Sequence, residues 1–72
     1  MSFQGYLKSI EAKTGMSAEQ LLDWGRSKGL ADDSGLTGEI KVGAILAQIK
    51  QEFDLGHGHA MAIVALLKGK RD

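Results

Sequence analysis

The architecture of this protein follows from residues 55–68, which read LGHGHAMAIVALLK. From Ala60 to Leu67 this segment contains no polar side chain, so a helix formed here is apolar on every side. A helix of that kind is buried from several directions. We therefore expect a helix over residues 58–68 that is the most buried in the chain, or one that completes its burial against a second copy of the protein.

Three further helices are indicated upstream by apolar side chains that recur at three- and four-residue intervals. They span residues 3–14, 18–28 and 40–53. Ser17 and Gln20 form the pattern of a capping box at the start of the second helix, and Gly15 and Gly29 are suited to ending the first two. Residues 31–38 are expected to form a loop, because Asp, Ser and Gly favour turns.

These elements predict an all-α protein, a compact bundle of four short helices in a single helical domain over residues 1–72. The chain has no cysteine, which excludes disulfides and thiolate metal sites. Nine basic and nine acidic side chains give no net charge, and this balance argues against a dedicated nucleic-acid binder. No apolar run is long enough to span a membrane and no signal peptide is visible, so we expect a cytoplasmic protein with no membrane partner.

Small residues mark one face of the last predicted helix, at spacings of four, three and four: Gly58, Ala62, Ala65 and Gly69. The preceding helix offers Gly43 and Ala47, also four residues apart. Small side chains allow two helix axes to approach closely. We therefore expect these two faces to meet.

The turn before the last helix carries the distinctive residues, and these form the predicted site for a ligand or anion: Gly56, His57, Gly58, His59 and Ala60. A glycine-rich turn that leads into a helix exposes backbone N–H groups, which bind phosphate or carboxylate. Gly56-His57-Gly58, with Ala62 four residues further on, resembles the Gly-x-Gly-x-x-x-Ala core of helix-hairpin-helix DNA-binding modules. That resemblance implies contacts with the nucleic-acid backbone that do not read the base sequence.

Three basic residues near the C-terminus are predicted to support such binding: Lys68, Lys70 and Arg71. They form the only basic cluster in the sequence. Phosphate contacts of this kind make binding weaken as salt rises.

Other roles for the two histidines are also open. Imidazole is a common ligand of zinc, copper and nickel, but His57 and His59 lack a third ligand at a recognisable spacing, and zinc sites use three or four protein ligands. A histidine near a helix N-terminus suits a general base, yet no nucleophile can be named. The structural interpretation is that the glycines permit a tight turn while the histidines cap the last helix. We expect no catalytic residues, no metal and no cofactor.

The chain resembles a family of small bacterial domains, domain-of-unknown-function family 4287. The resemblance rests on residues throughout the sequence: Phe3, Tyr6, Leu7, Ile10, Lys13-Thr14-Gly15, Lys41, Gly43, Lys50 and the run from Leu55 to Ile63. It implies a bacterial cytosolic protein with a compact helical fold, and it marks the glycine–histidine turn as the family's signature. It supplies no activity, substrate or cofactor.

The leading prediction is therefore a non-enzymatic binding or interaction module that uses residues 56–60. The expected partner is another protein, or a second copy that associates through the last helix. Binding to a nucleic-acid phosphate backbone is the alternative.

Overall fold

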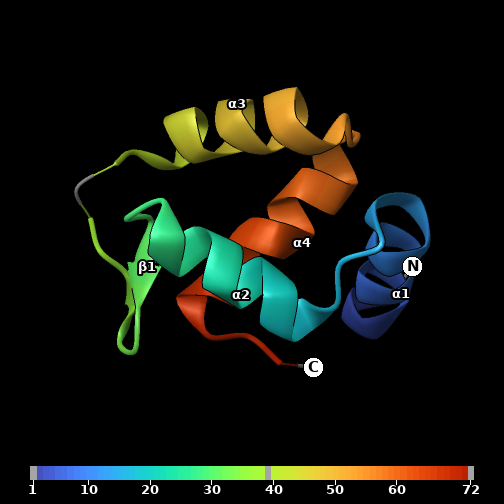
Figure 1. Ribbon diagram of the computed structural model, residues 1–72, viewed down its shortest axis with the longest axis horizontal. Helices are drawn as coiled ribbons and strands as arrows, with labels where there is room; N and C mark the ends of the chain where they lie inside the picture. Colours follow the sequence, from blue (N-terminus) through green and yellow to red (C-terminus); the bar gives the residue numbers. More distant parts are fainter. Residues whose placement is uncertain (1, 39, 72) are drawn as a thin grey trace.

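The computed structural model describes residues 2–38 and 40–71. Four helices and one short hairpin follow one another along the chain (Figure 1): α1 (Phe3–Thr14), α2 (Ala18–Ser27), β1 (Ala31–Asp32), β2 (Gly35–Leu36), α3 (Val42–Phe53) and α4 (His57–Lys68). The prediction of a compact, mainly helical protein with four helices is confirmed. The ends of the helices differ from the prediction by two residues at the start of α3 and by one at the end of α2 and the start of α4.

Local capping interactions fix the ends of the first two helices. The Ser2 side chain accepts a hydrogen bond from the backbone N–H of Gly5 at the start of α1. Gly15 ends that helix with a φ of +76°, a left-handed conformation that costs glycine little. The capping box predicted for α2 is present, since the Ser17 hydroxyl accepts from the Gln20 amide and the Gln20 side chain accepts from the Ser17 amide. Such caps satisfy amides that have no partner within the helix.

The prediction of a plain loop over residues 31–38 is wrong, because this segment contains a small antiparallel hairpin. Ala31 pairs with Leu36 and Asp32 pairs with Gly35. The turn follows the expected chemistry, since the Asp32 carboxylate accepts bonds from the backbone N–H and the hydroxyl of Ser34, at 2.8 and 2.7 Å. Two-residue strands are too short to produce the alternating pattern that identifies a strand in a sequence.

The hairpin rests on the C-terminal end of α4. Gly35 has a φ of +116°, and a Cβ atom added there would lie 3.2 Å from the carbonyl oxygen of Lys68. A side chain at this position would therefore meet both an unfavourable backbone conformation and a close backbone atom. The glycine lets β2 approach the last turn of α4.

Helix α4 packs against α1, α2, α3 and β2. In Figure 1 it passes between α3 and α2, with α1 to one side. Its buried residues are Ala60, Ala62, Ile63, Val64, Leu66 and Leu67. The other elements and loops contribute Ile10, Leu21, Leu30, Ala31, Ile45, Ile49 and Leu55. Contacts within one chain thus cover most of the apolar surface that the sequence predicted for this helix.

All buried side chains among residues 2–38 and 40–71 are apolar. Burial of apolar surface of this kind is the main favourable contribution to folding. None of the helices in these ranges has the combination of length and apolar character that is needed to cross a bilayer.

The expected contact between small-residue faces of α3 and α4 is wrong. Gly43 and Ala47 are exposed, and no atom of the described residues outside the helix backbone lies within 4 Å of the place that a Cβ atom of Gly43 would take. Helix α3 instead buries Ile45 and Ile49. These isoleucines lie on the opposite face of the helix because two residues correspond to about 200° of rotation. Larger apolar burial therefore decided which face of α3 turns inward.

Candidate functional site: a groove between α1 and α4

The five predicted site residues, 56–60, differ in their exposure to solvent. Gly56 provides the N-cap of α4 in an extended conformation, and Gly56, His57 and Gly58 are exposed. His59 is half-buried, and Ala60 is fully buried in the core. Ala60 is therefore a packing residue, while the three exposed positions are open to solvent.

His59 connects α4 to α1. Its Nε2 atom lies 2.9 Å from the hydroxyl oxygen of Ser9, and its ring meets the ring of Tyr6 edge-on, with centroids 5.2 Å apart and an interplanar angle of 88°. Edge-to-face aromatic pairs are favourable. The prediction that the histidines cap α4 is wrong, since no side chain among residues 2–38 and 40–71 caps the first turn of that helix with a hydrogen bond.

The Ser9–His59 pair has the spacing of a nucleophile and its base, and Ser9 was not identified from the sequence. Within residues 2–38 and 40–71, no carboxylate hydrogen-bonds to the other ring nitrogen of His59, the contact that orients the base in catalytic triads. Ser9 also lies in the middle of α1, half-buried at the contact with α4. Through this pair, a side-chain hydrogen bond joins the two helices.

The described residues hold no cluster of three or more metal-binding side chains placed to share an ion. The metal-ion alternative for the histidines thus gains no support from the geometry. His57 is exposed at the first position of α4, whereas His59 is directed to α1.

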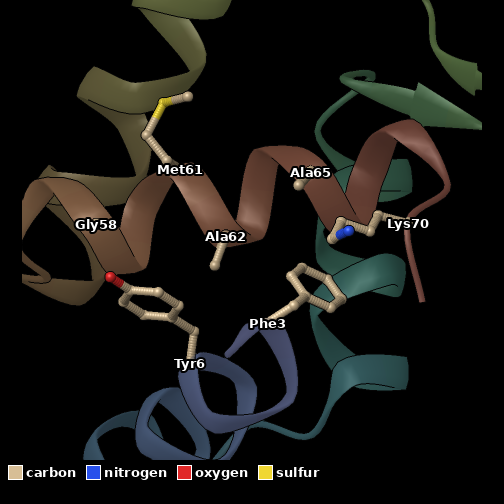
Figure 2. A pocket seen from close by; sticks show the side chains of 7 residues that line it. All are labelled: Phe3, Tyr6, Gly58, Met61, Ala62, Ala65 and Lys70. Atoms are coloured by element: carbon tan, nitrogen blue, oxygen red, sulfur yellow. The ribbon is translucent and has the colours of Figure 1, made fainter. Parts of the chain in front are cut away.

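A groove runs along α4 on the side that faces α1 (Figure 2). Its volume is about 320 Å³, and it is lined by Phe3, Tyr6, Gly58, Met61, Ala62, Ala65 and Lys70. Three of the four small residues predicted to face α3, namely Gly58, Ala62 and Ala65, line this groove instead. The aromatic rings of α1 form one wall, and they lie beside α4 in Figure 2. The groove exists because side chains on the floor are short while those beside it are long.

Two of these residues define the character of the groove. Met61 is 41% exposed and is the one large apolar side chain exposed to this degree in the described part of the chain. Gly58 lies against Tyr6. A Cβ atom added to Gly58 would be only 3.1 Å from the Tyr6 hydroxyl oxygen. The glycine–histidine turn thus helps to build the groove, with Gly58 forming one end and His59 positioning the Tyr6 ring.

Polar groups stand at the two ends of the groove. The hydroxyl of Tyr6 lies at the Gly58 end. The Nζ atom of Lys70 lies 5.3 Å from the centroid of the Phe3 ring at the other end. A cation above an aromatic face is favourable. None of the acidic side chains that the structure describes lines the groove.

The basic residues lie far from the turn that they were predicted to support. Lys68 ends α4, and with a rise of 1.5 Å per residue it lies about 16 Å along the helix from His57. Arg71 donates from Nη1 to the carbonyl oxygens of Leu66 and Lys70, at 3.0 and 2.9 Å. The structure therefore separates the basic cluster from the glycine–histidine turn and places it at the opposite end of α4.

A family model described as "Domain of unknown function (DUF4287)" matches residues 2–69. The chain belongs to this family. No curated protein and no solved structure matches it. The resemblance expected from the sequence is confirmed, and the DUF4287 match includes the whole groove except Lys70.

Proposed function

We propose that this DUF4287 domain is a non-enzymatic module that binds a segment of another protein in the groove between α1 and α4. The observation that carries the proposal is the mainly apolar lining of the groove, with the exposed Met61 at its edge and the buried Ala62 and half-buried Ala65 along its floor. Exposed apolar surface that is rimmed by polar groups is typical of interaction sites.

The shape of the groove favours a protein segment over a small molecule. Sites for small molecules enclose most of the ligand surface, whereas this groove lies open along the surface of α4. Grooves between helices recognise the apolar face of a partner segment. The unbranched Met61 side chain adapts to partners of different shape. In this proposal the glycine–histidine turn acts by shaping the groove, and not by direct contact through all five of its residues.

A peptide-display selection tests the proposal. A random library of short peptides is selected for binding to the full chain, and each binder is then measured against two variants. Ala65→Trp places a large ring in the groove, whereas Ala47→Trp places the same ring on the exposed face of α3. We expect the binders to lose affinity at least tenfold for Ala65→Trp and to keep it for Ala47→Trp.

The selection also separates this proposal from its competitors. Binders whose affinity is equal for both variants would contradict the groove as the site, and so would a selection that enriches no sequence. Self-association through the same surface predicts that the wild-type chain changes size with concentration and that Ala65→Trp remains monomeric. A concentration-dependent mass that disappears in Ala65→Trp would replace the partner segment with a second copy of the chain.

One observation favours phosphate binding as a second candidate. The first turn of α4 has no side-chain cap, and Gly56, His57 and Gly58 are exposed beside it. Free amides at a helix N-terminus attract anions. Lys68, Lys70 and Arg71 lie at the other end of α4. In this second candidate function, phosphate would therefore be bound by the backbone amides of the first turn of α4 and by His57.

A titration of the isotope-labelled chain with a short DNA duplex at low salt tests the second candidate. Phosphate binding predicts NMR shifts centred on residues 56–60 that shrink as salt rises. Shifts confined to Lys68, Lys70 and Arg71 would show non-specific attraction to the basic end alone. An unchanged spectrum would remove nucleic acid as a ligand.

A further inference from the structure

We infer that the occupant of the groove is an amphipathic helix of another protein that carries a carboxylate side chain at the end facing Lys70. This inference rests on the proposed function, and it names the chemical class of the partner. It is drawn from the distribution of charge around the groove and from the groove's length and profile.

The described residues at the α4 C-terminal end of the groove carry positive charge. Lys68, Lys70 and Arg71 are all exposed there. The ion pairs among residues 2–38 and 40–71 lie elsewhere, between Arg26 and Asp33 and between Lys28 and Glu52. Lys68, Lys70 and Arg71 therefore form no ion pair with a carboxylate in the described part of the chain.

Lys70 is the cation that the groove itself presents. Its ammonium group lies over the Phe3 ring and lines the groove, so it is held beside the apolar surface. Arg71 is directed elsewhere, since its guanidinium donates to backbone carbonyls. A carboxylate on the partner would meet Lys70 next to the Phe3 ring, where the apolar surroundings screen the pair less than open water does.

The length and profile of the groove suit a helix. The α4 residues that line the groove run from Gly58 to Ala65, which is about 10 Å along the helix axis and corresponds to roughly two helical turns of a partner, and Lys70 lies beyond them. The floor carries the short side chains of Ala62 and Ala65, and the larger side chains of Phe3 and Tyr6 lie beside it on the α1 side. A partner helix inserts large apolar side chains at three- and four-residue intervals into such a depression.

Three synthetic peptides of about 14 residues test the inference, a length that covers the groove and reaches Lys70. They share one stripe of leucines at helical spacing and differ only in the residues at one end, which are Glu, Gln or Lys. Binding to the full chain is measured by fluorescence anisotropy and mapped by NMR shifts of the groove residues. We expect the Glu peptide to bind about threefold tighter than the Gln peptide and the Lys peptide to bind more weakly.

Charge reversal provides the decisive control. Lys70→Glu should invert the preference, so that the Lys peptide becomes the tightest binder, whereas Lys8→Glu on the exposed surface of α1 should leave the order unchanged. An inverted preference requires a folded chain, so loss of folding cannot imitate it. The advantage of the Glu peptide should also decline as salt rises.

The outcomes distinguish this inference from the proposal on which it rests. Equal binding of all three peptides, with NMR shifts at Met61, Ala62 and Ala65, would overturn the carboxylate inference and leave the groove as the binding site. A preference that survives Lys70→Glu would also overturn it. If none of the peptides shifts groove resonances while display-selected binders also ignore Ala65→Trp, both the inference and the proposed function are wrong.

Discussion

The imidazole Nε2 atom of His59 lies 2.9 Å from the hydroxyl oxygen of Ser9, so a single hydrogen bond connects the first turn of α4 to the middle of α1. The same imidazole meets the Tyr6 ring edge-on. Tyr6 in turn lies against Gly58 and lines the groove. One histidine therefore sets both the contact between two helices and the position of a ring in the proposed binding surface.

Replacing His59 with alanine should lower the free energy of unfolding by about 2 kcal/mol, because it removes a hydrogen bond worth about 1 kcal/mol and an aromatic contact of similar worth. His57→Ala is the matched control, since His57 is exposed and lies two residues before His59 in the same helix. Its effect should stay within about 0.5 kcal/mol. Urea unfolding of both variants measures the difference, and equal losses would show that the Ser9 contact contributes nothing specific.

Gly25→Ala should destabilise the chain by about 1–2 kcal/mol. A Cβ atom at Gly25 would lie 2.4 Å from Cδ2 of Leu67, and both residues are buried. The cost of overpacking is about 1–3 kcal/mol, and it exceeds the gain of up to about 1 kcal/mol in helix propensity. Adding Leu67→Val should recover part of the loss, because valine lacks the obstructing methyl group.

Gly43→Ala is the control for that substitution, and it should have the opposite sign. The part of the chain that the structure describes places no atom beyond the helix backbone within 4 Å of the added Cβ, and Gly43 is exposed in α3. The gain in helix propensity should therefore appear as a stabilisation of about 0.5 kcal/mol. Thermal unfolding of both variants gives the comparison. Equal destabilisation by Gly43→Ala and Gly25→Ala would contradict the close packing of Gly25 against Leu67.

The pKa of Asp32 is lowered by the hydrogen bonds that its carboxylate accepts from the side chain and then the backbone of Ser34, with a smaller contribution from the charge of Arg26. A lowered pKa in the folded chain contributes stability above the unfolded pKa, near 3.9, and this stability is lost as pH falls through the folded pKa. Ser34→Ala should therefore raise the pKa of Asp32 toward its ordinary value. NMR titration of the Asp32 carboxyl carbon measures it, with Ser27→Ala as a variant that should leave this pKa unchanged.

Ser17→Ala should cost about 1 kcal/mol, because the serine side chain caps the Gln20 amide and anchors the capping box at the start of α2. Ser27→Ala is a suitable comparison at the other end of the same helix. The Ser27 hydroxyl donates to the carbonyl of Trp24 on the exposed surface, and its loss should change stability by less than about 0.5 kcal/mol. Chemical denaturation that ranks the two variants in the reverse order would contradict this assignment of the caps.

Much of the helical architecture follows from local sequence patterns. Ser17 and Gln20 stand three residues apart, and Gly15 follows the last turn of α1, so the signals that set these boundaries involve neighbouring residues. Capping chemistry of this kind can be read directly from a sequence. The family resemblance was also predictable, because the run from Leu55 to Ile63 is specific and lies within the matched segment.

The candidate site depended on contacts that no local pattern encodes. Ser9 and His59 are separated by fifty residues, and nothing at either position indicates the other. The spacing of Gly58, Ala62 and Ala65 correctly predicts that they share one face of α4. The prediction that this face packs against α3 is wrong, because these residues line the groove beside α1. Spacing shows which residues share a face of a helix, whereas the neighbour of that face is decided by how all the helices pack together.

The position of α4 in the chain has a consequence for how the protein is made. Synthesis proceeds from the N-terminus, so α1, α2 and α3 leave the ribosome before the helix against which all three pack. Until residues 57–68 have emerged, the faces that carry Ile10, Leu21 and Ile45 have no common partner. We therefore expect the nascent chain to acquire its tertiary structure in one late step, when the most distant part of its core finally arrives.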